Sequence, residues 1–246
     1  MTPFFVKRFV LALSFLSRLV PGRIVPSERL GLTLHYFPLA GLFLGVCAVL
    51  PFYLGLAAQY YWVQAFLFCG LSVYFTRGLH LDGLADVMDG WGSNARGEEF
   101  WRVLKDGCAG PFGVIGIFFA LSGQIILSHE MFVECAFGTL VWSFILGRLS
   151  ILGLAWAGRD MTRPGLGRAF ISQADGPTFF KGFISALFFG IWLTPLTCLA
   201  LSLIFSVLGQ IALFRLARTR GGMNGDFLGA SVIFGELSAP LAWVLL

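Results

Sequence analysis

Long apolar stretches alternate with short polar ones along this chain, and the alternation predicts helices that cross a membrane. A helix needs about 20 apolar residues to span the hydrocarbon core of a bilayer. Pro195 divides one long apolar stretch in two, because proline interrupts a continuous helix. The pattern therefore predicts an all-α fold, a polytopic membrane helical bundle of about seven transmembrane helices at residues 35–57, 61–78, 111–128, 132–157, 179–194, 196–214 and 227–246.

The N-terminal segment has a different pattern. Lys7, Arg8 and Arg18 interrupt the apolar stretch of residues 3–20, whose Phe and Leu positions share one helical face. No A-x-A-like cleavage site follows, as it would in a secretory signal peptide. We therefore expect a short N-terminal helix that lies at the membrane interface.

The composition supports the membrane assignment and excludes other classes. Only 12% of the 246 residues are charged, 57% are hydrophobic, and the mean hydropathy is +0.83. Soluble domains are nearer to 25% charged. Disordered, disulfide-rich secreted and nucleic-acid-binding proteins are excluded together. We expect one domain over residues 1–246 in a lipid bilayer, with no nucleic-acid partner; the sequence leaves open whether it forms a homo-oligomer.

The basic residues indicate the orientation of the chain. With seven spans, all 17 Lys and Arg residues fall on one side of the membrane. The loops of the opposite side, near residues 58–60 and 129–131, contain none. Because Lys and Arg concentrate in cytoplasmic loops, the polar loops at 79–110, 158–178 and 215–226 are predicted to face the cytoplasm.

An acidic segment follows the second predicted span. Asp82, Asp86 and Asp89 are spaced i, i+4, i+7, which places them within about 60° on one helical face. Six of the 13 acidic residues fall within residues 82–106. Three adjacent carboxylates repel one another unless a cation lies among them. Oxygen ligands of this kind suit Mg²⁺, Mn²⁺ or Ca²⁺; the alternative is a solvated helix end.

Two further polar clusters precede predicted spans. Lys105 and Asp106 come shortly before Gly110, and Asp226 follows a glycine-rich run. Backbone amides of glycine-rich turns can approach phosphate closely, although a plain interhelical turn would have the same composition. The candidate phosphate contacts in the second cluster are Gly221, Gly222, Gly225 and Asp226.

Two charged residues lie at or within predicted spans. Charges in a membrane are costly, so Arg148 and Glu236 are candidates for function. Arg148 could instead extend to the cytoplasmic surface. Glu236 is placed near mid-membrane, where pairing with a basic residue or exposure to a polar cavity is expected.

These patterns together favour phosphoryl-transfer chemistry. A divalent cation held by carboxylates can polarise phosphorus and stabilise a leaving phosphate. We therefore predict a metal-dependent phosphotransferase that acts on a diphosphate substrate at the cytoplasmic face. A cation-coupled transporter is the alternative, although transporters usually keep such carboxylates near the bilayer midplane.

The string HLDGLAD at residues 80–86, followed by Asp89-Gly90, resembles the signature of the cobalamin synthase family, the adenosylcobinamide-GDP ribazoletransferases. Arg77 and Asn224 stand where that family usually has Gly and Thr, and Gly107 stands where it usually has Ser. Further motifs resemble the family in the same order, at residues 15–19, 36–41, 105–113, 221–230 and 235–237.

The resemblance implies that adenosylcobinamide-GDP reacts with α-ribazole or its 5′-phosphate, that GMP leaves, and that Mg²⁺ is required. It also implies a bacterial cytoplasmic (inner) membrane location. The carboxylate pattern is similar to that of CDP-alcohol phosphotransferases too, so another diphosphate substrate is the alternative. On this resemblance we expect Asp82, Asp86 and Asp89 to hold the metal.

The same resemblance suggests roles for the remaining candidates. Asp106 is a further ligand or base, and His80 orients a carboxylate or the attacking hydroxyl. Lys105 and Arg148 neutralise the diphosphate. The substrate pocket is completed by Gly110, Gly221, Gly222, Gly225 and Asp226.

Overall fold

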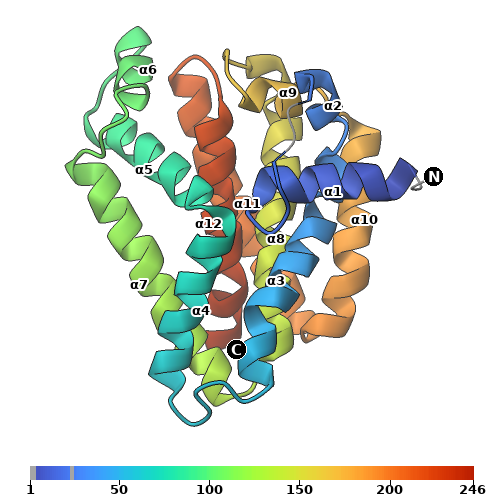
Figure 1. Cartoon of the computed structure of the whole chain (residues 1–246). Helices are drawn as coiled ribbons and strands as arrows, with labels where there is room; N and C mark the ends of the chain where they lie inside the picture. Colours follow the sequence, from blue (N-terminus) through green and yellow to red (C-terminus); the bar gives the residue numbers. More distant parts are fainter. Residues whose placement is uncertain (1–3, 23–24) are drawn as a thin grey trace.

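The computed structural model describes residues 4–22 and 25–246, so residues 1–3 and 23–24 of the expected domain lie outside the described part (Figure 1). The described residues form helices, with one isolated parallel bridge between Thr162 and Met223 and no strand. The helices are α1 (Phe4–Leu16), α2 (Ser27–Gly31), η1 (Leu34–Tyr36), α3 (Phe37–Tyr53), α4 (Tyr61–Thr76), α5 (Leu79–Gly92), α6 (Glu98–Leu104), α7 (Pro111–Val133), α8 (Phe137–Ala157), η2 (Arg159–Met161), α9 (Gly167–Ile171), α10 (Gly176–Leu193), α11 (Leu196–Thr219) and α12 (Gly225–Val244).

The helical membrane bundle is confirmed. Among the described residues, six helical segments are long and apolar enough to cross a membrane: Ser27–Tyr53, α7, α8, α10, α11 and α12. The remaining predicted span, at residues 61–78, corresponds to α4, which is apolar but has only 16 residues. Pro195 does separate α10 from α11, since it caps the N-terminus of α11.

Three span boundaries differ from the prediction by five residues. The third span extends to Val133 instead of 128, the fourth begins at Phe137 instead of 132, and the sixth extends to Thr219 instead of 214. The polar residues near 128 were interpreted as a loop, but they are accommodated within α7. Ser128 donates to the carbonyl of Gln124 one turn earlier, and His129 lies 2.9 Å from Glu130 (Nδ1 to Oε1). The chain turns instead at Cys135, which has a positive φ of 54°.

The helix α8 forms the centre of the bundle. Of its apolar window, 83% is buried, against 17% for the peripheral α10. Glycines allow this packing: a Cβ on Gly45 would lie 3.0 Å from the Val141 carbonyl oxygen, and one on Gly235 would lie 2.7 Å from Cα of Gly147. Small residues that let backbones approach closely are typical of membrane helix interfaces.

The N-terminal helix α1 lies across the bundle instead of along it (Figure 1). Its outer end is exposed, with Phe5 53% accessible, whereas Ala12 and Leu16 at its inner end are buried. A hydrogen bond of 2.8 Å from Nη2 of Arg77 to the carbonyl of Phe15 joins α1 to the end of α4. The expected interfacial helix is therefore present, but its second half is part of the protein core.

Candidate functional site

The helices α5 and α12 cross at two glycines. A Cβ on Gly83 would lie 2.8 Å from the carbonyl oxygen of Asp226, and one on Gly229 would lie 3.4 Å from Cα of Gly83. A side chain at Gly83 would force the backbone of α12 to move, whereas at Gly229 the two backbones leave only van der Waals distance for a Cβ. The crossing brings Asp82 and Asp86 of α5 into electrostatic contact with Asp226, the second residue of α12.

These three residues are named here the carboxylate cluster: Asp82, Asp86 and Asp226. Burial raises the pKa of Asp86 to about 7, and the negative charges of Asp226, Asp82 and Asp89 add to this shift. A raised pKa means that the charged form of Asp86 lacks a compensating positive group. The cluster therefore has the electrostatic character of a cation site.

The donor atoms of the cluster also suit a hard divalent cation, because carboxylate oxygens are the ligands that Mg²⁺ prefers. Within residues 4–22 and 25–246, however, no three His, Cys, Asp or Glu side chains gather closely enough around one point to hold a metal ion. The cluster fits a divalent cation in charge and in donor type, and cation binding would require its side chains to converge.

Asp89 has a different environment from the one expected. Its Oδ2 accepts a hydrogen bond of 2.7 Å from the amide of Gly110, and its Oδ1 accepts one of 2.8 Å from the amide of Gly113. Both amides lie at the N-terminus of α7, where backbone donors have no intrahelical partner. Asp89 thus caps α7, and Gly110 contacts this carboxylate. These two hydrogen bonds hold Asp89 against α7, and the expected roles of Asp89 as a metal ligand and of Gly110 as a substrate contact stay predictions.

Asn224 holds Asp226 in place. Asn224 caps the N-terminus of α12, with its Oδ1 accepting from the Asp226 amide at 3.2 Å. Its Nδ2 donates to Oδ2 of Asp226 at 2.6 Å. The side-chain amide of Asn224 therefore caps the helix and also holds one carboxylate oxygen of Asp226 in place.

The glycine-rich segment before α12 has two parts with different roles. Gly221 and Gly222 have positive φ values of 76° and 148°, which turn the chain out of α11. Gly225 lies farther on, beside the cluster, and packs against Gly167 of α9, where a Cβ on Gly167 would lie 2.6 Å from its Cα. Of the three glycines in this segment that were expected to bind substrate, the structure brings Gly225 to the cavity beside the cluster.

A row of buried polar side chains lies beneath the cluster. The guanidinium of Arg148 forms an ion pair with Glu236, and its Nη2 lies 3.4 Å from Nε2 of His80. Arg148 has no solvent-accessible surface, and His80 and Glu236 are 4% and 6% exposed. The expected pairing of Glu236 with a basic residue is confirmed. The alternative, in which Arg148 extends to the cytoplasmic surface, is wrong, because this side chain is fully buried. Its positive charge is compensated inside the protein by Glu236.

The segment between α6 and α7 contributes exposed residues. Lys105 and Asp106 are both exposed there, and in the part of the chain that the structure describes neither side chain forms a hydrogen bond or an ion pair. Asp106 is also absent from the charges that act on Asp86. The structure therefore does not bring these two candidates into the cluster. Gly107 has a φ of 67°, a conformation that accounts for glycine at this position.

A cavity of about 310 Å³ opens beside the cluster. Asp82, Asn224 and Asp226 contribute its polar wall, and His80 also lines it. The remaining wall is largely apolar and comes from six helices, α1, α3, α5, α8, α9 and α12, through Phe15, Leu16, Phe37, Leu79, Ile151, Phe170 and Leu228. Phe15, Leu16, Phe37 and Leu228 belong to the motifs that resemble the family, but in a chain with 27 Phe residues the residue type alone does not distinguish a cavity wall from a lipid-facing surface.

In comparisons with known proteins, residues 8–244 match the model of the cobalamin-5-phosphate synthase family. A relative from Nitratidesulfovibrio vulgaris (strain DSM 19637 / Miyazaki F), named adenosylcobinamide-GDP ribazoletransferase, is 41% identical over 97% of this chain and 95% of its own length. A relative of the same name from Chlorobium phaeobacteroides (strain BS1) is 32% identical over 92% of this chain and 90% of its own. No solved structure matches the chain significantly.

Proposed function

The chain belongs to the cobalamin-5-phosphate synthase family, and from this premise we propose that it joins adenosylcobinamide-GDP to α-ribazole or α-ribazole 5′-phosphate with release of GMP. A ribose hydroxyl forms the new oxygen–phosphorus bond at the phosphate attached to cobinamide. The bond from that phosphorus to the oxygen of GMP breaks. The proton of the attacking hydroxyl passes to a carboxylate of the cluster.

The observation that carries this proposal is the carboxylate cluster at the crossing of α5 and α12. Its members come from two helices held together at Gly83 and Gly229, so their backbones are fixed. The cluster lies at the polar wall of a cavity large enough for a small substrate. Phosphoryl transfer depends mainly on positioning and on charge stabilisation, which this arrangement supports.

Under the proposal, Mg²⁺ would be held by Asp82, Asp86 and Asp226. When bound, it would neutralise the charge of the diphosphate and of the departing GMP. Asp89 supports the site differently, since it ties α5 to the N-terminus of α7. Asn224 orients Asp226 and leaves one of its carboxylate oxygens free of that hydrogen bond.

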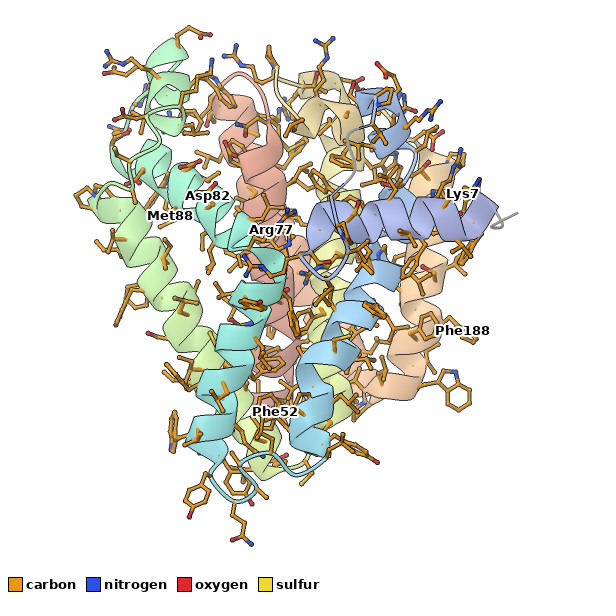
Figure 2. All side chains as sticks on the ribbon, in the orientation of Figure 1. Lys7, Phe52, Arg77, Asp82, Met88 and Phe188 are labelled. Atoms are coloured by element: carbon orange, nitrogen blue, oxygen red, sulfur yellow. The ribbon has the colours of Figure 1, made fainter. Side chains whose placement is uncertain are left out.

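We place the site at the cytoplasmic face of the bacterial inner membrane. In Figure 1, the loops near α2, α6 and α9, which are rich in Lys and Arg, lie at one end of the bundle. Asp82 lies toward that same end, whereas Phe52 lies toward the other (Figure 2). The concentration of basic residues at this end supports a cytoplasmic orientation.

The buried charges argue against the transporter alternative. A cation pathway would need free carboxylates within the bilayer. Among the described residues of the spans, the deep Glu236 is already paired with Arg148, and its charge is thereby matched. The cluster lies at the end of the bundle, as an enzyme acting on a soluble diphosphate requires.

The proposal is tested with the full chain purified in lipid nanodiscs. GMP release is followed with adenosylcobinamide-GDP, α-ribazole and Mg²⁺, with α-ribazole omitted in one control and EDTA added in another. The proposal expects release that needs both α-ribazole and the metal. Equal release without α-ribazole would indicate hydrolysis, and activity undiminished by EDTA would overturn the Mg²⁺ assignment. Transfer with CDP-linked alcohols in place of adenosylcobinamide-GDP would support the CDP-alcohol alternative.

A further inference from the structure

We infer that the apolar cavity beneath α1 binds the heterocyclic base of the acceptor nucleoside, with His80 as the hydrogen-bond donor that recognises it. The inference rests on the proposed function and deepens it, because it names which part of which substrate fills the cavity. It also gives the cavity a role in selecting the base that is incorporated.

The cavity has a closed apolar end and an open polar end. Leu16, Phe37, Phe170 and Ile151, which line it, are each at most 3% exposed. Leu166, which also lines it, is 70% exposed. A ligand therefore enters past the loop before α9 and reaches the buried residues last. Asp82 is exposed and belongs to the open end, where an attacking ribose hydroxyl must meet the phosphate.

The buried residues select an apolar aromatic group. Phe15 and Phe170 lie 4.7 Å apart between ring centroids, and Phe37 and Phe170 lie 5.2 Å apart, so the wall is an aromatic cluster. Aromatic rings pack well against a flat bicyclic base. A wall of this kind offers few hydrogen-bond partners, and a buried polar group without partners is costly.

His80 supplies one specific polar contact in this wall. Its Nδ1 is buried and has no hydrogen-bond partner among the residues that the structure describes, and His80 lines the cavity. The neighbour of its Nε2 is the guanidinium of Arg148, which can donate but cannot accept. Nε2 must therefore be the unprotonated nitrogen, and Nδ1 carries the hydrogen as a donor that awaits an acceptor.

Comparison of the substrate parts identifies the occupant. The corrin ring of the donor substrate is far too large for a cavity of about 310 Å³, which lies at the small end of the range for ligand sites. Guanine has several donors and acceptors that the apolar wall would leave unpaired. The benzimidazole of α-ribazole is apolar apart from one unsubstituted ring nitrogen, which is an acceptor and matches the free donor of His80.

Arg148 and Glu236 are positioning residues in this arrangement. They do not line the cavity, but their ion pair fixes the guanidinium whose donor sets the tautomer of His80. The buried ion pair and the free donor at Nδ1 thus act together in the recognition of the base.

The cavity wall is tested by changing one side chain in both directions. Ile151→Phe fills the closed end, and Ile151→Ala enlarges it. The Michaelis constants of the wild-type protein and each variant are measured for α-ribazole, for a riboside with a purine base, and for adenosylcobinamide-GDP. We expect Ile151→Phe to raise the KM for α-ribazole by roughly tenfold or more, since one methylene in an apolar pocket has an effect of that order. Ile151→Ala is expected to reduce the preference for α-ribazole over the purine riboside. The KM for adenosylcobinamide-GDP is expected to stay unchanged in both.

A matched control separates base binding from general loss of packing. Ile145→Ala removes the same volume from α8 at a fully buried position that packs with Trp142 and does not line the cavity. It is expected to lower stability without changing base preference. Equal effects of Ile145→Ala and Ile151→Ala on base preference, or a raised KM for the donor instead of the acceptor, would overturn the inference.

The hydrogen bond of His80 is tested with a substrate analogue. An indole riboside has the shape of a benzimidazole riboside but lacks the acceptor nitrogen. The wild-type protein is expected to prefer the benzimidazole riboside by about tenfold, the value of one neutral hydrogen bond, and His80→Phe is expected to remove that preference. A preference of the wild-type size in His80→Phe would refute the contact.

The failure of the proposed function and the failure of the cavity assignment can be distinguished. If the wild-type protein releases no GMP with any acceptor, the proposed function itself fails. If the protein releases GMP but copurifies with a phospholipid whose acyl chain fills the cavity and is not displaced by α-ribazole, only the cavity assignment fails.

Discussion

Arg148 and Glu236 pair inside the bundle, although 88 residues separate them in the sequence and neither side chain is more than 5% exposed. The pair joins α8, the central helix, to α12, which carries Asp226. Removal of one partner leaves the other charge buried without compensation, which costs far more than the pair itself contributes.

We predict that Glu236→Gln lowers the free energy of unfolding by about 3–5 kcal/mol, measured by thermal or denaturant unfolding in lipid nanodiscs. The double variant Arg148→Met with Glu236→Leu is expected to lose less, because it leaves no buried charge unpaired. Glu99→Gln is the control, since the pair of Glu99 with Arg102 is exposed and should contribute less than about 1 kcal/mol. Similar stability losses for Glu236→Gln and Glu99→Gln would contradict a charged buried pair.

Asp82→Asn is predicted to separate activity from stability. Transfer of the phosphoryl group should fall by roughly 100-fold or more, the usual effect of removing one charge-stabilising group. The melting temperature of the metal-free protein should rise, because one of the carboxylates that repel Asp86 is neutralised. Asp160→Asn is the control, since that side chain is 88% exposed and lies outside the cluster. A metal-free Asp82→Asn protein less stable than wild type would count against a repulsive cluster.

Asp89→Asn is predicted to lower stability more than activity, the opposite of Asp82→Asn. An asparagine can accept only one of the two amide hydrogen bonds at the start of α7, so the free energy of unfolding should fall by about 1–2 kcal/mol. Transfer activity measured well below the melting temperature should fall less than in Asp82→Asn. Loss of activity as complete as in Asp82→Asn, with unchanged stability, would instead support the metal-ligand role expected from the sequence.

The pKa of Asp86 predicts that Mg²⁺ binding depends on pH. In the metal-free protein this pKa is about 7, raised from 3.8 by burial and neighbouring carboxylates. A cation binds the ionised carboxylate, so binding below pH 7 must displace a proton, and affinity should fall by roughly tenfold per pH unit. Above pH 7 the affinity should level off. Calorimetric titration with Mg²⁺ between about pH 5.5 and pH 8.5 would measure the slope, and the proton released should appear in buffers of different ionisation enthalpy.

Asp86→Asn should abolish that slope, since the titrating group is gone, while Glu98→Gln on the neighbouring α6 should leave it unchanged. A wild-type affinity that stays constant from about pH 5.5 to pH 7 would show that Asp86 is already ionised or does not contact the cation.

Much of the site could be predicted from local spacing. The i, i+4, i+7 pattern indicated the face of α5, and the rarity of charge in apolar stretches singled out Glu236 and Arg148. Both predictions depend on properties that a single helix or a single side chain carries. Each of these two buried charges needs a partner of opposite charge, and the predicted spans contain few charged residues.

The other features of the site depend on tertiary contacts, and the residue types alone do not indicate which residues form these contacts. The donors to Asp89 are backbone amides, which every residue except proline possesses, so nothing marks Gly110 and Gly113 as its partners. Gly83 and Gly229 are typical of close helix packing, but no pattern says that they face each other. Phe37 in the cavity wall and Phe188, which is 60% exposed and projects from the bundle in Figure 2, are the same residue type in apolar stretches, and hydropathy alone does not separate them.

The crossing of Gly83 with Gly229 also sets the order in which the enzyme can become active during its synthesis. The helix α5 leaves the ribosome before α7, α8, α10 and α11, and α12 leaves after all of them. Until α12 inserts, Asp82 and Asp86 lack Asp226, Arg148 lacks Glu236, and the cavity lacks one wall. A chain that ends before α12 would thus lack the complete cluster, the buried ion pair and one wall of the cavity, so we expect it to be inactive.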